Sequence, residues 1–175
     1  QWGAMSPRVA RFASLVFLSA FALGACGGSE GDDVNVEEEV QSNLDAFPEG
    51  FTKINLDRVP MSAHGDTYVD IWVTDADADE YRSVVPMPES GSGVSMGQGA
   101  MVIKEMFDID GNRLRGTVLY KAPAGYDETF GDWFRAEIDA DFQVGMSGKI
   151  GYCYDCHEGR GDDDYLWGIE SDNQM

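Results

Sequence analysis

The sequence AMVIKEMF (residues 100–107) is followed by the pair Asp110-Gly111 and then by RLRGTVLYK (residues 113–121). Both segments are rich in β-branched and other apolar residues, a composition typical of strands. An Asp-Gly pair between two such segments is a strong hairpin signal, because both residues tolerate the positive φ angles of a tight turn. The sequence therefore predicts an antiparallel hairpin in which residues 100–107 pair with residues 113–121.

Two more segments have the composition of strands, TYVDIWVT (67–74) and WFRAEID (133–139). The segment from Pro86 to Gly99, rich in proline and glycine, is predicted to be a loop. Short helices are predicted at Val36 to Phe47, at Ala76 to Ser83 after the N-cap Asp75, and at the carboxy-terminal Gly148 to His157. The expected fold class is α+β, a small antiparallel sheet with a few short helices.

The chain is short and strongly acidic. Its 175 residues fit one ordinary domain with tails, and 32 acidic against 12 basic residues give a formal charge of −20. Nucleic-acid binding requires a basic face, and anionic lipid headgroups repel an acidic surface. The composition therefore argues against a nucleic-acid partner and leaves a lipid anchor as the expected contact with a membrane.

The amino-terminal residues have the pattern of an export signal that starts at Met5. Two arginines precede the apolar run FASLVFLSAFAL (12–23), and small residues follow it. The segment Leu23-Gly24-Ala25-Cys26 resembles the lipobox of bacterial lipoproteins, whose cysteine is acylated and becomes the new amino terminus. A plain secretory signal with an incidental cysteine is the alternative.

The pattern predicts a periplasmic protein of a Gram-negative bacterium, anchored through lipidated Cys26, with the outer membrane as the expected location. The predicted boundaries are residues 1–25 for the export signal, residues 26–35 for the lipidated cysteine with a flexible acidic tether, and residues 36–175 for a single domain.

Cys153-Tyr-Asp-Cys156-His157, near the carboxy terminus, has the pattern C-x-x-C-H that attaches c-type haem. Residues three apart share one face of a helix, so both sulfurs can form thioethers with the two vinyl groups on one edge of the haem. The following imidazole lies under the ring, where it can bind the iron. The sequence predicts one covalently attached haem c on a carboxy-terminal helix, with Cys153, Cys156 and His157 as its attachment and proximal-ligand residues.

A zinc site and a redox-active cysteine pair are the other common uses of C-x-x-C. Zinc would need two more thiolate or imidazole ligands, and the sequence has only one other cysteine, Cys26, and one other histidine, His64. A thioredoxin-like pair is expected early in a chain beside a βαβ unit. Haem attachment is therefore favoured, and it agrees with export, since c-type haem is attached outside the bacterial cytoplasm.

A series of short motifs surrounds this pattern in a characteristic order. They are His64-Gly65; Tyr68 to Tyr81; Val102-Ile103-Lys104-Glu105; Lys121-Ala-Pro-Ala-Gly125-Tyr126-Asp127; Gly131-Asp132-Trp133; the haem motif; and Asp164-Tyr165. From about Phe47 to Gly168 the chain thereby resembles the cytochrome P-460 family, which includes the β-type cytochromes c-prime. The resemblance implies a β-rich haem pocket, often in a homodimer, with His157 as proximal ligand and an open or apolar-capped distal face on the sheet.

Lys104 distinguishes the two branches of that family, which either oxidise hydroxylamine through a lysine-crosslinked haem or bind nitric oxide at an uncrosslinked one. Strand alternation places Ala100, Val102 and Met106 on the face of Lys104. An amine buried there would have a lowered pKa and become nucleophilic. The resemblance aligns Lys104 with the crosslinking lysine; an amine that reaches solvent at a sheet edge is the alternative. Lys121 is a second candidate, placed by Ala-Pro-Ala-Gly at an exposed strand end.

Several other residues have both a site interpretation and a purely structural one. His64 is either a distal ligand or a histidine in a surface turn. Core packing explains the methionines and aromatic residues that could approach the haem, Met61, Met101, Met106, Phe107, Tyr120 and Trp133, equally well. Arg82, Arg115 and Glu105 could handle protons or propionates, or be ordinary paired charges. The run Asp162-Asp163-Asp164 is predicted to be a solvated turn.

Two functions follow from these predictions. The first is a mono-haem cytochrome that binds a small nitrogen-containing ligand such as nitric oxide, or carries electrons to a redox partner. The alternative is an oxidoreductase that acts on hydroxylamine through a Lys104-crosslinked haem, which needs a nearby carboxylate to accept protons. Glu105 should point away from Lys104, so the sequence assigns no proton acceptor, and the first function is favoured.

Overall fold

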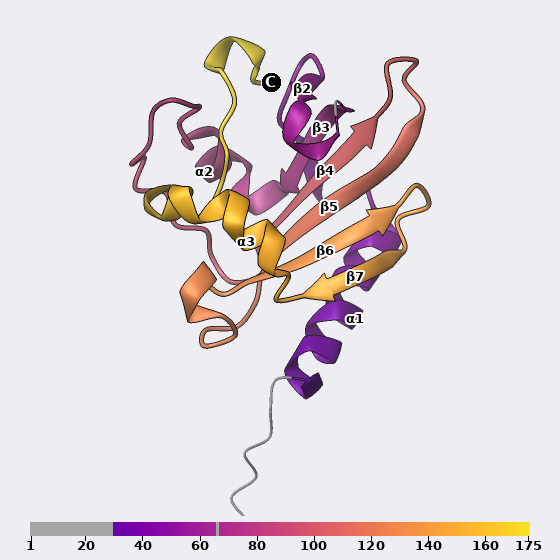
Figure 1. Cartoon of the computed structure of the whole chain (residues 1–175), viewed down its shortest axis with the longest axis vertical. Coiled ribbons are helices and arrows are strands. Elements are labelled where there is room, and N and C mark those ends of the chain that lie inside the picture. The colour runs from indigo at the N-terminus through magenta and orange to yellow at the C-terminus, as the bar shows by residue number, and fades with distance from the viewer. Residues whose placement is uncertain (1–29, 66) are drawn as a thin grey trace, which may run out of the picture.

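The computed structural model describes residues 30–65 and 67–175 (Figure 1). The predicted export signal and the lipidation site Cys26 lie outside these residues. No helix in the described part of the chain is long and apolar enough to cross a membrane.

The described residues form an antiparallel sheet of seven strands in the order β1-β3-β4-β5-β6-β7, with β2 also paired to β3. The strands are β1 (Phe51–Lys53), β2 (Val59–Met61), β3 (Thr67–Thr74), β4 (Met101–Phe107), β5 (Arg113–Lys121), β6 (Trp133–Asp139) and β7 (Val144–Gly148). The helices are α1 (Glu30–Ala46), α2 (Ala78–Arg82) and α3 (Gly151–His157), with 3₁₀ turns at Ser62–His64, Asp75–Asp77, Glu128–Phe130, Glu158–Asp163 and Ser171–Asn173. The α+β class with an antiparallel sheet and a carboxy-terminal helix is thus confirmed.

The predicted hairpin forms the middle of the sheet. β4 pairs with β5 from Met101 opposite Tyr120 to Phe107 opposite Arg113. Gly111 in the connecting turn has a φ of 86°, which explains the glycine at this position. Strand β4 is buried on both faces, because each of its residues is buried, whereas the first three residues of β5 are exposed.

Helices and loops cover the two faces of the sheet. Figure 1 shows α3 in front of the sheet and α1 behind it. On the back face, three apolar residues of α1 pack against the sheet: Val36, Val40 and Leu44. On the front face, the segment after β3 and the carboxy-terminal segment contribute buried residues such as Tyr81 and Leu166. Alternation along each strand therefore supplies two separate apolar clusters.

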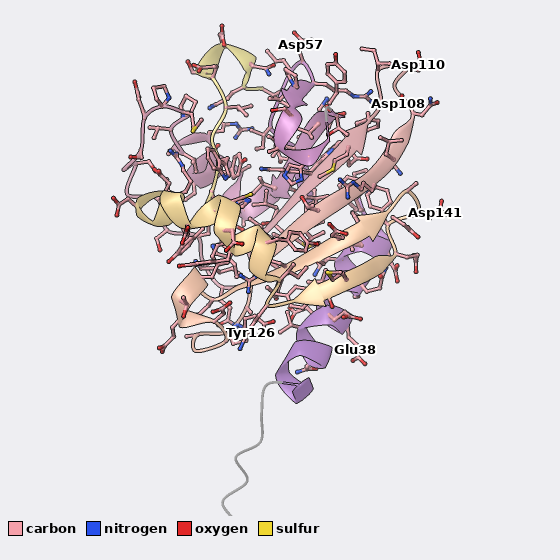
Figure 2. The ribbon with its side chains drawn as sticks, in the orientation of Figure 1. Glu38, Asp57, Asp108, Asp110, Tyr126 and Asp141 are labelled. Atoms are coloured by element: carbon pink, nitrogen blue, oxygen red, sulfur yellow. The ribbon has the colours of Figure 1, made fainter. Side chains whose placement is uncertain are left out.

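Acidic residues gather at the turns between strands. Figure 2 shows Asp57, Asp108 and Asp110 at the top of the molecule and Asp141 at its right edge, all above Glu38 of α1. Asp57, Asp110 and Asp141 are exposed, so the charges of these three turn residues are solvated.

The sequence prediction missed three short strands and misplaced the starts of the three described helices. β1 and β2 have three residues each and β7 has five, too few for a recognisable alternation. α1 begins at Glu30, so the later part of the predicted acidic tether is helical. β7 occupies Val144–Gly148, so α3 begins only at Gly151.

The helix predicted after β3 is also shorter than expected. A 3₁₀ turn covers Asp75–Asp77, and α2 begins at Ala78. Asp75 does not act as N-cap, because its carboxylate accepts a hydrogen bond from the Thr52 hydroxyl at 2.6 Å. The Thr74 hydroxyl donates instead to Asp77 at 2.7 Å, which closes the turn.

Candidate functional site

A cavity of about 660 Å³ lies between the front face of the sheet and the carboxy-terminal segment. Its walls come from the segment Val59–His64, from the middle of β4, β5 and β6, from α3, and from residues 167–169. Cofactor pockets usually enclose roughly 300–1,000 Å³ and are mainly apolar. The cavity has the size of a cofactor site, and several of its wall residues are aliphatic, including Ile71, Val102 and Leu119.

Helix α3 brings the predicted haem-attachment residues into this cavity. Cys153, Cys156 and His157 all line it, and neither cysteine is in a disulfide. Burial raises the pKa of the Cys153 thiol to about 11. A redox-active C-x-x-C pair usually has a lowered thiol pKa, so the environment of Cys153 does not favour that alternative.

The imidazole of His157 is held in one tautomer. Its Nδ1 lies 2.6 Å from the backbone carbonyl oxygen of Tyr165. A carbonyl only accepts hydrogen bonds, so Nδ1 carries the proton and Nε2 is the nitrogen suited to bind a metal. Burial, with a smaller effect of the Lys104 charge, lowers the pKa of His157 to about 4. The imidazole is therefore neutral at pH 7, as ligation requires.

The turn that supplies this carbonyl has an unusual backbone. Asp164 and Tyr165 are consecutive non-glycine residues with φ angles of 53° and 61°. Such left-handed residues cost on the order of 1–3 kcal/mol each and persist when their surroundings hold them in place. Tyr165 is held at both ends, since its amide donates to the Arg160 carbonyl at 2.7 Å and its hydroxyl to the Thr129 carbonyl at 2.9 Å.

Lys121 holds the same turn, which corrects its predicted exposure. Its Nζ donates to both carboxylate oxygens of Asp164, at 2.6 and 2.7 Å, and lies 4.7 Å from the centre of the Trp133 ring. Its side chain is 13% exposed and that of Asp164 is 9% exposed. Lys121 is thus an ion-paired structural residue and does not line the cavity.

The acidic run after α3 is also more buried than predicted. Asp163 is fully buried and accepts hydrogen bonds from the backbone amides of Gly91 and Ser92 at 3.0 and 2.7 Å. The neighbouring Arg160 donates to the carbonyl oxygens of Val85 and Glu89. The prediction of a solvated turn is therefore wrong for Asp163 and Asp164, which bind backbone groups far away in the sequence.

Three polar side chains form a row on the wall opposite α3. Lys104 of β4 pairs with Thr117 of β5, which pairs with Glu137 of β6, and all three line the cavity. Lys104 is 6% exposed, and burial lowers the pKa of its amine to about 8. The alternative of an amine that reaches solvent at a sheet edge is therefore wrong. The strand places the amine in the cavity that also contains His157.

Glu137 was not singled out in the sequence. The Tyr152 hydroxyl donates to its carboxylate at 2.9 Å, and Arg115 lies 3.8 Å from it. Arg115 also donates to the backbone carbonyl of His64 at 3.3 Å. The alternation in WFRAEID was visible, but only the strand register shows that Glu137 lies in one row with Lys104.

His64 is a half-buried residue of the cavity wall and is not simply a surface-turn histidine. Burial lowers its pKa, and the charges of Lys104 and Arg115 add to this effect. Met61 also lines the cavity, whereas the other methionine and aromatic candidates do not: Met101, Met106, Phe107, Tyr120 and Trp133. These five residues are buried in the core.

Glu105 points to the back of the sheet, as predicted. Its carboxylate pairs with Arg113 at 2.8 Å and does not line the cavity. Burial raises the pKa of Glu105, although the Arg113 charge opposes this shift. Glu105 is therefore not available as a proton acceptor in the cavity.

The residues that line the cavity fit a c-type haem. The site combines a wall with many aliphatic residues, two unbridged thiols three residues apart on one helix, and a neutral imidazole with a fixed tautomer. The described residues contain no group of three or more His, Cys, Asp and Glu side chains that could hold a bare metal ion. Comparison of the chain with family models, with curated proteins and with solved structures gave no match.

Proposed function

We propose that this chain is a mono-haem c-type cytochrome of the kind that it resembles, the cytochrome P-460 family, and that it binds a small ligand such as nitric oxide or transfers electrons. The observation that carries the proposal is that Cys153, Cys156 and His157 of α3 line one cofactor-sized cavity. When bound, the haem would supply an iron atom for ligand binding or electron transfer. The lipid anchor on Cys26, the periplasmic location, a separate redox partner and a homodimer remain part of this proposal.

The chain's own residues have distinct tasks in this function. Cys153 and Cys156 would form the thioethers, and Nε2 of His157 would bind the iron while its Nδ1–H donates to the Tyr165 carbonyl. Aliphatic side chains of β3, β4 and β5 limit water in the cavity, which favours neutral diatomic ligands. This arrangement needs no catalytic acid or base.

Expression together with a haem-attachment machinery tests the proposal. The wild-type protein should be coloured, and its mass should exceed that of the processed polypeptide and lipid by one haem. Cys153→Ala and Cys156→Ala should each remove one thioether, whereas His157→Ala should keep the covalent haem and lose the ligand-field spectrum of an axial imidazole. Cys26→Ser is the matched control, because it should release the protein from membranes with its haem intact. A colourless wild-type product would contradict the proposal.

The second candidate function, hydroxylamine oxidation with a Lys104-crosslinked haem, is favoured by two features of the cavity. The Lys104 amine is buried and its pKa is lowered to about 8, so part of the amine population is neutral and nucleophilic at pH 7 to 8. Glu137, two strands away in the same row, supplies the carboxylate that the sequence alone did not assign. Hydroxylamine oxidation releases protons as well as electrons, and Glu137 is placed to accept the protons.

The crosslink would join Lys104 Nζ to a carbon at the porphyrin edge. One N–H and one C–H bond are lost and a C–N bond forms, so two protons and two electrons must pass to an oxidant; with hydrogen peroxide as that oxidant, two water molecules result. The product is detected as a proteolytic haem peptide that also contains the Lys104 peptide. An ordinary c-type spectrum that Lys104→Met leaves unchanged would exclude this candidate.

Glu137→Gln separates the two functions. If hydroxylamine is the substrate, the loss of a proton acceptor should reduce turnover by about 10²- to 10⁴-fold, while binding of nitric oxide to the reduced protein changes little. Thr117→Val is the matched control, since it removes a neutral polar group from the same row of the cavity wall.

A further inference from the structure

The turn that follows α3 connects a buried ion pair to the axial imidazole. We propose that Asp164, held by Lys121 and Trp133, is a positioning residue for His157: it fixes the Tyr165 carbonyl against Nδ1–H and thereby lowers the reduction potential of the bound iron. The inference rests on the proposed function, since it assumes that His157 is the proximal ligand.

Asp164 has contacts on every side of the turn. Its carboxylate accepts hydrogen bonds from Lys121 Nζ at 2.6 Å and from the backbone amide of Met96 at 2.8 Å. Trp133 Nε1–H donates to the backbone carbonyl of Asp164 at 2.9 Å. The next carbonyl along the chain, that of Tyr165, accepts the hydrogen bond from His157. The two carbonyls of adjacent residues are thus fixed by one buried group of side chains.

The backbone itself shows why the turn needs such an anchor. Both Asp164 and Tyr165 have left-handed φ angles, which an unsupported turn of non-glycine residues rarely keeps. Gly131 packs against this turn so closely that a Cβ atom there would lie 3.0 Å from the Tyr165 ring and 3.1 Å from the Asp164 carboxylate. The position of the Tyr165 carbonyl therefore depends on the contacts that hold the turn and not on local backbone preference. Those of Asp164 act together with the bonds of Tyr165 to Arg160 and Thr129.

The hydrogen bond at Nδ1 controls how strongly the imidazole donates electrons to iron. A short contact to a carbonyl makes the ligand more basic and stabilises the ferric state. If the turn relaxes, this contact lengthens and the ferrous state becomes more stable relative to the ferric state. The reduction potential therefore rises. A stabilising role of Asp164 alone would not predict this change.

Charge effects and positioning predict different signs, which makes the test specific. Lys121→Met removes a positive charge, so electrostatics alone would lower the potential, whereas loss of positioning raises it. Lys121→Met with Asp164→Asn removes both charges, so electrostatics alone would leave the potential nearly unchanged. Positioning predicts a rise in both proteins, up to about a tenfold change in the ferrous-to-ferric ratio, or about 59 mV for one electron. The frequency of the iron–histidine stretch should fall in both.

Redox titration and resonance Raman spectra of the purified holoproteins give the two readouts. Lys53→Met is the matched control, because it breaks a comparable ion pair with Asp70 at 2.9 Å, outside the cavity, and should leave both readouts unchanged. Trp133→Phe removes the indole N–H donor, keeps an aromatic ring in this fully buried position and leaves both charges of the ion pair in place, so it serves as a second variant if the ion-pair variants do not mature. It should shift both readouts in the same direction by a smaller amount.

The outcomes separate the inference from the proposed function. A wild-type protein without covalent haem contradicts the proposed function itself. Normal holoprotein with a lower potential in Lys121→Met, and with no change in the double variant, overturns the positioning role while His157 ligation stands. If only Trp133→Phe matures, an unchanged potential and iron–histidine frequency overturn the positioning role.

Discussion

Strand β4 buries two neighbouring charged side chains on opposite faces of the sheet, and the two faces accommodate them differently. On the back face, Glu105 is 4% exposed and pairs with Arg113 at 2.8 Å. On the front face, Lys104 is 6% exposed, and no ion pair involves it in the described part of the chain. The back face is a closed core in which a charge is neutralised by a partner, whereas the front face keeps an amine available beside a cavity.

Equal truncations on the two faces should include the largest single loss of stability. Ile103 is fully buried within the cluster covered by α1, whereas Ile71 lies beside Lys104 in the wall of the cavity. We expect Ile103→Ala to cost about 4 kcal/mol and Ile71→Ala about 2 kcal/mol, because only the first opens a new void in a packed region. Urea unfolding of both variants without haem measures this difference, and equal losses would contradict the distinction between the faces.

Lys104→Met should stabilise the haem-free protein at neutral pH. The amine has a pKa of about 8 when folded and 10.5 as a reference value, so between these values the unfolded chain binds more protons and wild-type stability rises with pH. The difference corresponds to about 3 kcal/mol. At pH 7 the free energy of unfolding of the variant should therefore exceed that of the wild type by up to about 3 kcal/mol. Between pH 8 and 10.5 the variant should not show the increase in stability expected for the wild type.

Thermal unfolding from pH 7 to 11 tests this expectation for Lys104. Lys53→Met is the control, because it removes a lysine whose side chain is 25% exposed. Its stability should still increase with pH as that of the wild type does. A wild-type protein whose stability is flat in this range would show that the amine is not buried in solution.

Arg113→Met should have the smallest of these effects. It leaves the Glu105 carboxylate buried without its partner, but Arg113 is 37% exposed, so the pair is partly screened by solvent. We expect a loss of about 1–2 kcal/mol, reduced from the larger cost of breaking a fully buried pair. Addition of Glu105→Gln should recover most of the loss, and a double variant as unstable as the single one would argue against this pairing.

The sequence predicted the central sheet well because its strands are long and their pattern is local. The predicted hairpin and the segment Thr67–Thr74 agree with the structure closely. The three short strands were missed, since their pairing is decided by tertiary contacts and not by their own composition. The start of α3 was also misplaced, because β7 includes Gly148, where the helix was predicted to begin.

For the candidate site, the sequence identified groups within one motif better than groups that meet across the sheet. The spacing of Cys153, Cys156 and His157 was enough to place them on one face of a helix. Strand alternation placed Lys104 on an apolar face but left open whether its amine is buried or reaches solvent, and the structure buries it. Glu137 needed the register of three strands, and the ion pair of Lys121 joins residues that are far apart in the chain. Periodicity carries no information of that kind.

The contacts of Arg160 and Asp163 join the loop after α2 to the segment after α3. The buried carboxylate binds the amides of Gly91 and Ser92, and the guanidinium binds the carbonyl of Val85. Apart from the Ser92 hydroxyl, which also donates to Asp163 at 2.6 Å, the loop contributes main-chain atoms to this attachment, so most of its side chains could change while the attachment persists. Slow hydrogen exchange at the Gly91 and Ser92 amides would consequently show that the carboxy-terminal segment with Asp163 is packed against this loop.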